Sequence, residues 1–427
     1  SFSSNVNENQ KTEVTVINCK FYEVSSQNGG GGAIYFNAPS QKLTVKESSF
    51  TNIHAYNSNS KGGAIYAKYQ SENMPVIIID CYFENTYSYE GGAIYIEREE
   101  AASSEITISD CYIEKANANS NGHSIIISKS TSDTVSISNC QIINCGSALK
   151  SYTVVLDVLN LNFLNNQIIF TDITKNCGCV ELKKIGSHFF KGNIFKNANY
   201  DDGSYQSAGI QLKYDNQFTT IEIENNTFDH FQGNHEGRCI NLNIKNNAVI
   251  IKNNTFKNCP RGGSVVKVVF QDRINDIFLI SECYFLNNDY NGAVDDIVGS
   301  TPQVWIQNTE QNSFENSISI TFEDCHFIDN FNYKSGGGLI YGKNKYTANT
   351  QLRIFKCEFQ NNSATVNGGA LSIQIYQRCT IEDCVFIKNK SENGCGTIFI
   401  ETEFKCTNPT TGLDDLQFTY SRDPNIL

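Results

Sequence analysis

Paired aspartates are the side chains of this 427-residue chain that could most readily do chemistry. Two carboxyl groups on one face can act as acid and base at a glycosidic bond, or bind calcium. One doublet, at residue 295, follows a strand-like segment, residues 292–294. We expect these aspartates to be polar residues of turns, and we predict no catalytic residue. The alternative is that Asp295 is catalytic. The aspartate doublets are Asp201–Asp202, Asp295–Asp296 and Asp414–Asp415.

Histidine and cysteine, the usual protein ligands of zinc, are not grouped in this sequence. The sixteen cysteines include no pair of CxxC knuckles, and no histidine cluster accompanies them. We therefore predict neither a metal site nor a bound cofactor. The six histidines are His54, His123, His188, His230, His235 and His326.

Two motifs alternate along the chain and must position any functional residue. Cys81-Tyr82-Phe83 alternates apolar and surface residues, which indicates a strand with one buried face. Residues 91–95, GGAIY, form a glycine turn that leads into another short strand. One copy cannot bury its own Phe83 and Ile94, so neighbouring copies must cover them.

The apolar residue of the first motif recurs every 27 to 33 residues, except for a step of 21 before Phe163 and one of 42 before Phe327. It is found at Phe21, Phe50, Phe83, Ile113, Ile142, Phe163, Phe195, Phe228, Phe256, Phe285, Phe327, Phe359 and Phe386. The glycine pairs keep the same period, at Gly31, Gly62, Gly91, Gly262, Gly337 and Gly368. Two motifs with one period indicate a repeat architecture.

The segments between the motifs predict the kind of repeat. They alternate β-branched and polar residues, as in Glu105–Ser109 and Ser317–Phe322, and none carries a capped helical stripe. We predict an all-β, single-stranded parallel β-helix of about 13 coils. Its domain would span residues 14–406, between a leader or cap (1–13) and a C-terminal tail (407–427) that caps the last coil or docks on another subunit.

The motifs GGA[ILV] and FxxN resemble the repeat of bacterial polymorphic outer membrane proteins. The first is intact at residues 31–34, 62–65, 91–94 and 368–371, and the second at 163–166, 285–288, 327–330, 359–362 and 386–389. The resemblance implies a right-handed β-helix similar to the pectin-lyase fold and a large surface protein. Some enzymes of that fold degrade acidic polysaccharides. Of the polygalacturonase motif set, only Asp295–Asp296 has a match here, because the chain contains no RxK triplet.

Aromatic side chains offer a candidate binding surface. Tyr35, Tyr66 and Tyr95 follow the isoleucine of successive copies, so we expect them to face outwards in a column that binds glycans or another protein, or that shields the strands beneath. The long step before Phe327 predicts a loop over residues 299–316 that contains Trp305. This loop would bind a partner or pack onto the solenoid.

Cysteines and asparagines indicate the compartment. Eight cysteines lie two residues before the repeated apolar residue, so we expect an inward column of small buried side chains or of disulfides. The last coils could be held together by a disulfide among Cys379, Cys395 and Cys406. This cysteine usage and four sequons favour an oxidising, extracellular location for a glycoprotein. The sequons are Asn225, Asn253, Asn361 and Asn389, each expected in a turn.

Net charge and hydropathy exclude several partners. The net charge of −12 is spread along the chain, which argues against nucleic acid, and no apolar run is long enough to span a membrane. The chain opens at Ser1 rather than Met, as removal of a signal peptide would leave it. We predict a secreted or surface-displayed, non-catalytic β-helical rod that is structural or adhesive and that associates with itself, with other surface proteins or with glycans. The alternatives are a polysaccharide lyase or glycoside hydrolase and a glycan-binding module.

Overall fold

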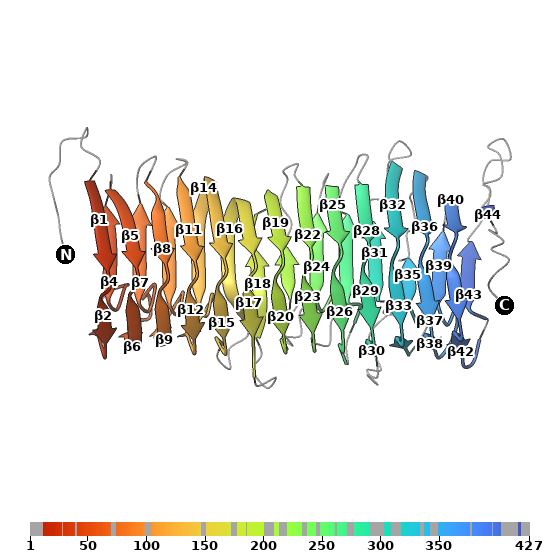
Figure 1. Cartoon of the computed structure of the whole chain (residues 1–427), viewed down its shortest axis with the longest axis horizontal. Helices are drawn as coiled ribbons and strands as arrows, with labels where there is room; N and C mark the ends of the chain where they lie inside the picture. Colours follow the sequence, from red (N-terminus) through yellow and green to blue (C-terminus); the bar gives the residue numbers. More distant parts are fainter. Residues whose placement is uncertain are drawn as a thin grey trace. The chain divides into compact units, whose positions relative to one another are not determined.

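The computed structural model describes residues 12–27, 29–38, 41–69, 74–98, 104–146, 151–171, 177–184, 186–199, 209–212, 220–232, 237–244, 248–260, 263–270, 277–290, 303–308, 317–333, 337–341, 349–375, 378–394, 396–402 and 417–419. Over these residues the chain is all-β and has no helix. Its strands pair in parallel and stack as a β-solenoid, which confirms the predicted all-β parallel solenoid (Figure 1). The chain divides into two compact units, residues 1–202 with 208–215, and residues 203–207 with 216–427.

In the first unit, the coils build three stacks of parallel strands. The first stack contains β1 (Thr12–Ile17), β5 (Gln41–Lys46), β8 (Val76–Ile79), β11 (Glu105–Ser109), the second halves of β14 (Ile125–Ser138) and β16 (Ser151–Leu164), and β19 (Ser187–Lys191). The second contains β2 (Lys20–Tyr22), β6 (Ser49–Ala55), β9 (Tyr82–Ser88), β12 (Tyr112–Glu114), β15 (Gln141–Ile143), β17 (Gln167–Ile169) and β20 (Ile194–Lys196), with β3 (Ser25–Ser26) and β13 (Asn117–Ala118) at its side. The third contains β4 (Ile34–Ala38), β7 (Ile65–Tyr69), β10 (Ile94–Arg98), the first halves of β14 and β16, β18 (Cys177–Leu182) and β21 (Ile210–Leu212).

The second unit repeats this arrangement. Its first stack contains β22 (Thr220–Glu224), β25 (Ala248–Lys252), β28 (Ile277–Ser281), β32 (Ser317–Glu323), β36 (Asn349–Phe355), β40 (Arg378–Glu382) and β44 (Gln417–Thr419). The second contains β23 (Thr227–Asp229), β26 (Thr255–Lys257), β29 (Tyr284–Leu286), β33 (His326–Ile328), β37 (Glu358–Gln360) and β41 (Val385–Ile387). Beside it lie β30 (Asp289–Tyr290), β34 (Phe331–Asn332), β38 (Ser363–Ala364) and β42 (Lys390–Ser391). The third set contains β24 (Ile240–Ile244), β27 (Val266–Phe270), β31 (Val304–Asn308), β35 (Leu339–Tyr341), β39 (Leu371–Ile375) and β43 (Ile398–Thr402).

Single residues in the left-handed conformation turn the chain between the first and second stacks. Asp80 (φ 53°) and Asn139 (φ 55°) do so in the first unit, and Asn253 (φ 51°) does so in the second. Asparagine and aspartate adopt this conformation more readily than other non-glycine residues. The need for such corners in every coil explains part of the use of 53 asparagines.

The glycine pair has two separate roles. Gly91 has a φ of 65°, which bends the chain into β10. Gly92 lies so close to the next coil that a Cβ there would be 2.1 Å from the main-chain oxygen of His123. The first glycine therefore makes the turn, and the second allows two coils to approach.

Aromatic rings form the centre of the core in both units. Phe21, Phe50 and Phe83 stack face to face, with ring centroids 4.9 and 4.8 Å apart. From Phe285 to Phe327 the spacing is 4.7 Å, close to the distance between neighbouring strands. Each ring thus contacts the coils next to it, as the repeat predicts.

The assignment of Phe163 to this column was wrong. Phe163 lies on β16 opposite Ile137 of β14, in the first stack of strands. Ile168 takes its place, because it pairs with Ile142 on one side and Phe195 on the other. The steps become 26 and 27 residues, which removes the irregular step of 21.

A column of small polar side chains lies beside the rings. Cys81, Cys111 and Cys140 occupy it with their thiols buried, as predicted. The Cys140 thiol donates to the carbonyl oxygens of Ser138 and Ile108, at 3.3 and 3.7 Å. In the next coil Asn166 takes this position, and its amide donates to Ile137 O at 2.8 Å. Thiol and amide therefore satisfy equivalent main-chain carbonyls.

Two strands extend beyond the predicted limits of the repeat domain, residues 14–406. Strand β1 begins at Thr12, inside the expected leader. Strand β44 belongs to the expected tail and pairs with β40, so that Phe418 lies opposite Ile381.

Candidate functional site

The three predicted tyrosines lie on neighbouring strands of the third stack. Tyr35 pairs with Tyr66, and Tyr66 with Tyr95, and their ring centroids are 5.2 and 5.6 Å apart. The expected exposed column is nevertheless wrong for two of them. Tyr35 is 49% exposed, whereas Tyr66 and Tyr95 are only 9% and 5% exposed. A ligand could reach the Tyr35 ring in this structure, but it could not reach a continuous aromatic face.

Charged side chains cover the two buried rings. Glu97 of β10 accepts hydrogen bonds from Tyr66 OH at 2.7 Å, from Lys61 Nζ at 2.8 Å and from Lys129 Nζ at 3.1 Å. The Lys61 ammonium also lies 4.7 Å from the centre of the Tyr95 ring. This group, named here the Glu97 cluster, joins Lys61, Tyr66, Tyr95, Glu97 and Lys129.

Electrostatics hold the Glu97 cluster in one protonation state. Burial alone would raise the pKa of Glu97, but the donors on Lys61, Tyr66 and Lys129 lower it to about 2. Burial and the Glu97 carboxylate raise the pKa of the Tyr66 hydroxyl well above its usual range. The carboxylate is therefore fully ionised and fully hydrogen-bonded at neutral pH, which suits a structural role better than proton transfer.

Trp305 lies on a strand and not in the loop that was predicted. Strand β31 pairs with β27, and Trp305 is directly opposite Lys267. The Lys267 ammonium lies 5.6 Å from the indole ring. The indole Nε1 is buried and has no hydrogen-bond partner within the described part of the chain. Trp305 thus packs on the solenoid and has one unused donor.

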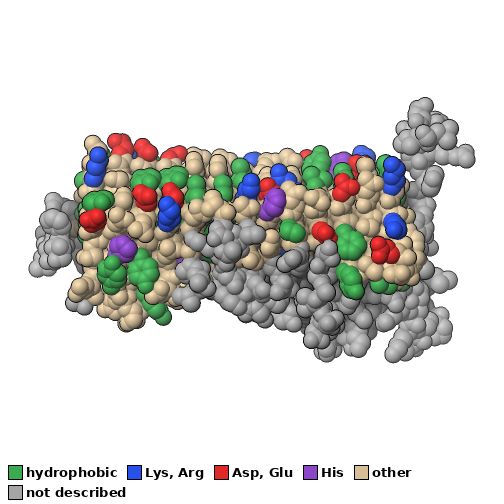
Figure 2. Space-filling model, turned by 90° about the horizontal axis from the view of Figure 1, so that it is seen from below, with side chains coloured by type: hydrophobic (Ala, Val, Ile, Leu, Met, Phe, Trp, Pro, Cys, Tyr) green, Lys and Arg blue, Asp and Glu red, His purple; other side chains and the backbone are tan. Residues whose placement is uncertain are grey.

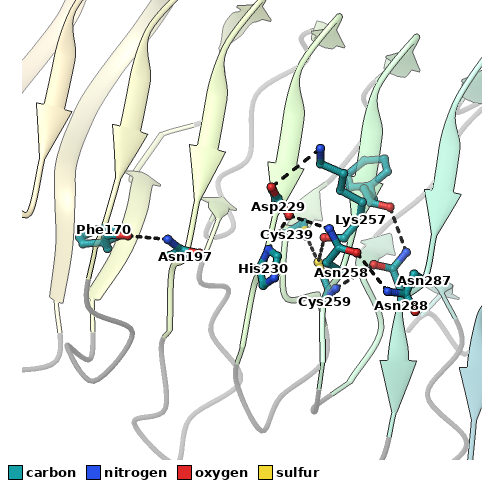
Figure 3. A network of polar contacts seen from close by, with 11 residues as sticks. Phe170, Asn197, Asp229, His230, Cys239, Lys257, Asn258, Cys259, Asn287 and Asn288 are labelled. Carbon is teal, nitrogen blue, oxygen red and sulfur yellow. Dashed lines mark hydrogen bonds and ion pairs between the residues drawn. The ribbon is translucent and has the colours of Figure 1, made fainter.

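A second polar group lies around Asp229, at the end of β23 in the second unit (Figure 3). Asp229 pairs with His230 Nδ1 at 2.6 Å, and it accepts a hydrogen bond from the Asn258 amide at 3.0 Å. The Lys257 ammonium is 3.8 Å from its other oxygen. Burial would raise the pKa of Asp229, but these neighbours lower it. A histidine beside a carboxylate can act as a general base, yet here the carboxylate bonds the turns of adjacent coils together.

The four sequons do not share one environment. Asn225, Asn253 and Asn361 occupy left-handed corners, as expected of turn residues, and the last two are exposed. The Asn253 amide donates to Asn225 Oδ1 at 2.5 Å on the exposed surface, whereas the Asn389 amide donates to the main-chain Phe359 O at 2.7 Å inside a partly buried ladder of asparagines. A glycan on this nitrogen would be incompatible with that ladder.

Several predicted groups lie outside the described residues. These are the three aspartate doublets, Cys395 and Cys406. The fourteen described cysteines are free thiols, so the expected disulfides within the cysteine column are absent among them. No group of metal-ligating side chains occurs in the described ranges.

The surface is mixed in charge on the face that Figure 2 shows. Acidic and basic side chains are interspersed there and do not gather into a patch of one sign. Within the described ranges, the chain has no helix that could cross a membrane.

Comparison of the chain with models of protein families, with curated proteins and with solved structures found no match.

Sequence reasoning missed the residues that bind the coils together through charge. Lys61 and Glu97 are 36 residues apart, a little more than one coil, so no local motif marks them as partners. Arg238 and His123 are buried at the position that Gly92 occupies in other copies. The sequence does mark these two residues in one way, because each replaces the second glycine of the pair. A long side chain then stands at a position that faces the core.

Proposed function

We propose that this protein is a non-catalytic structural component of an extracellular or cell-surface layer. The proposal rests on the columns of stacked side chains that run without a break inside each unit. In the second unit, the aromatic column continues from Phe228 to Phe386 at centroid spacings of 4.7 to 5.1 Å. An asparagine ladder follows the same coils from Asn288 to Asn389.

These columns make each unit stiff. Parallel main-chain hydrogen bonds join every coil to its neighbours along several strands, and the buried polar side chains add bonds between the same coils. Buried polar networks that are fully satisfied hold one arrangement strongly. A stiff solenoid is suited to spacing or supporting other molecules, in agreement with the repeat that resembles polymorphic outer membrane proteins and their right-handed β-helices.

We further propose that the chain associates with copies of itself. The first described coil has partly exposed rungs, because Val14, Val16 and Phe21 are half-buried whereas their partners on the next coil, Leu43, Val45 and Phe50, are fully buried. Among the described strands, β1 and β4 pair on one side only, with β5 and β7. An edge of this kind accepts a strand from another chain, and the apolar rungs would be buried by it.

An extracellular location fits the polar turns that carry exposed sequons, at Asn253 and Asn361. Glycans at these corners would point away from the core and would not disturb the columns.

The proposal is tested by negative-stain electron microscopy of the native protein together with assays on acidic and neutral polysaccharides, with and without calcium. Ordered assemblies and no release of sugar are expected. Isolated particles that cleave a polysaccharide would replace the proposal with an enzyme, and the Asp295–Asp296 doublet would then be the first target.

A glycan-binding function is the second candidate, because the Tyr35 ring is 49% exposed and could stack on a sugar. Tyr35→Ser removes this ring, and Tyr22→Ser removes an exposed ring of β2 as the control. Reduced retention on a glycan column by Tyr35→Ser alone would favour the second candidate, and equal retention of all three proteins would remove it.

A further inference from the structure

Two buried thiols of the second unit are in direct contact. Cys239 lies just before β24, and Cys259 lies just after β26 on the following coil. Both are fully buried, and their Sγ atoms are 3.7 Å apart. Figure 3 shows the two side chains directed toward each other. A disulfide needs a separation of about 2 Å, so a movement of roughly 2 Å would join them.

The thiols of the cysteine column are engaged differently. The Cys283 thiol donates to Ser281 O at 3.2 Å and to Ile251 O at 3.5 Å. The Cys325 thiol donates to Ile280 O and Glu323 O, at 3.4 and 3.3 Å. Cys283 and Cys325 continue the column of Asn226 and Asn254, and each thiol bonds carbonyls of its own coil and of the preceding one. The Cys259 thiol instead donates to Lys257 O of its own coil, at 3.3 Å, and contacts the Cys239 sulfur.

A buried cation lies beside the contacting pair. Arg238 directs Nη1 to the carbonyl oxygen of Cys259 and is 2% exposed. Burial opposes ionisation of Cys259, but the Cys239 thiol and the Arg238 guanidinium lower the pKa of Cys259 below its ordinary value. The thiolate is the reactive form of cysteine, so Cys259 becomes the better nucleophile once Cys239 and Arg238 have come together with it during folding.

The pair is also a local departure from the repeat. Gly237-Arg238-Cys239 stands where other copies have two glycines and an alanine, as at Gly91-Gly92-Ala93. In those copies the alanine position carries no reactive group. The three unusual features, namely the arginine and the two thiols, occur together.

We propose that Cys239 and Cys259 form a disulfide that links two consecutive coils of the second unit. A low-molecular-weight disulfide is the oxidant. The Cys259 thiolate attacks one of its sulfurs and releases one thiolate, which takes up a proton. Cys239 loses its proton and attacks Cys259 Sγ in the mixed disulfide, which releases the second small thiol. Two protein thiols are thereby oxidised, and one small disulfide is reduced to two thiols.

This bond would stabilise the coils that it joins. It closes a loop of about 20 residues and restricts the unfolded chain. Because both thiols are buried in the folded unit, exchange takes place while the chain folds. The inference rests on the contact of the two thiols and does not depend on the proposed structural function.

Peptide mapping tests the proposal. The whole chain is unfolded in urea, refolded in a buffer of reduced and oxidised glutathione, alkylated and digested with trypsin without reduction. Trypsin cuts after Arg238, Lys245, Lys257 and Arg261, so residues 239–245 and 258–261 each carry one cysteine. The expected product is these two peptides joined, with separation on reduction and with Cys283 and Cys325 alkylated. Recovery of the two peptides only as separate alkylated species overturns the proposal.

Cys239→Ala provides a second measurement, because alanine is the residue of this position in other copies and should fold. Oxidised wild-type protein should unfold several degrees above the same protein kept in reductant. The variant should show no difference between the two buffers. An equal shift in wild type and variant would show that another bond is responsible and would contradict the assignment.

Discussion

The side-chain oxygen of Asn330 accepts a hydrogen bond from the main-chain N–H of Asn288, one coil earlier, at 3.1 Å. Asn288 in turn donates through its side chain to Phe256 O at 3.0 Å, and its Oδ1 accepts the N–H of Cys259 at 3.1 Å. Each amide thus satisfies main-chain groups of the preceding coil by using both its donor and its acceptor. This ladder requires amides at its rungs and no charge.

Asn288→Asp should destabilise the second unit by about 3 kcal/mol or more, because a carboxylate oxygen would face Phe256 O without a proton between them. Asn287→Asp is the matched control, since Asn287 occupies the same turn with its side chain exposed. It should change the free energy of unfolding by no more than about 0.5 kcal/mol. Urea denaturation measures both, and equal losses would mean that Asn288 is not part of a buried ladder.

Acid should destabilise the first unit through His188. Burial lowers the pKa of this imidazole to about 4, against 6.5 for a free histidine. The unfolded chain then binds a proton that the folded chain does not, so stability falls as the pH drops from 6.5 to 4, by about 3 kcal/mol. Thermal unfolding between pH 7 and pH 4 measures this loss. It should be smaller in His188→Leu, and parallel curves for the wild type and this variant would be inconsistent with a neutral buried imidazole.

Glu97→Gln should cost about 3 kcal/mol at neutral pH, because Lys61 and Lys129 would lose their shared carboxylate. The folded pKa of about 2 is depressed from 4.5, so this stabilisation is complete above pH 4.5 and is lost as the pH falls toward 2. Denaturant titrations at pH 7 and pH 3 should therefore show a smaller difference at the lower pH. Glu84→Gln, on the surface beside Tyr82, is the control and should have little effect. A difference that stays constant with pH would contradict the ionised cluster.

Glycan occupancy should differ among the sequons. We expect Asn253 and Asn361 to be modified when the chain is secreted from a eukaryotic host, and Asn389 to remain free, because its amide belongs to the ladder. Enzymatic release of glycans in heavy-oxygen water followed by mass spectrometry reads out each site. Full occupancy of Asn389 in folded protein would disprove its assigned hydrogen bonds.

The fold was predictable because every coil must place an apolar side chain at the same height. The spacing of Phe83 and Ile113 alone therefore predicts their strands, and the two residues are paired directly in the structure. Phe163 was assigned to the ring column because Asn166 completes a local FxxN match. That asparagine belongs instead to the column of Cys140. Only the pairing of Ile168 with Ile142 distinguishes the two registers.

The candidate surface was harder to predict. Alternation along β10 places Tyr95 and Glu97 on the side away from the core, but it does not say what covers them. Their burial depends on Lys61 and Lys129, which come from neighbouring coils. Likewise, the long step before Phe327 suggested a loop around Trp305, whereas the pairing of β31 with β27 is a tertiary property.

Sedimentation velocity across a hundredfold range of protein concentration tests the central claim most directly. The structural account predicts species larger than the 47.7 kDa monomer that grow with concentration. Ile17→Lys, which places a charge on the exposed edge of β1, should abolish them, whereas Ile277→Lys, at a similarly exposed residue of β28, should not. A single monomeric species at every concentration would contradict the claim.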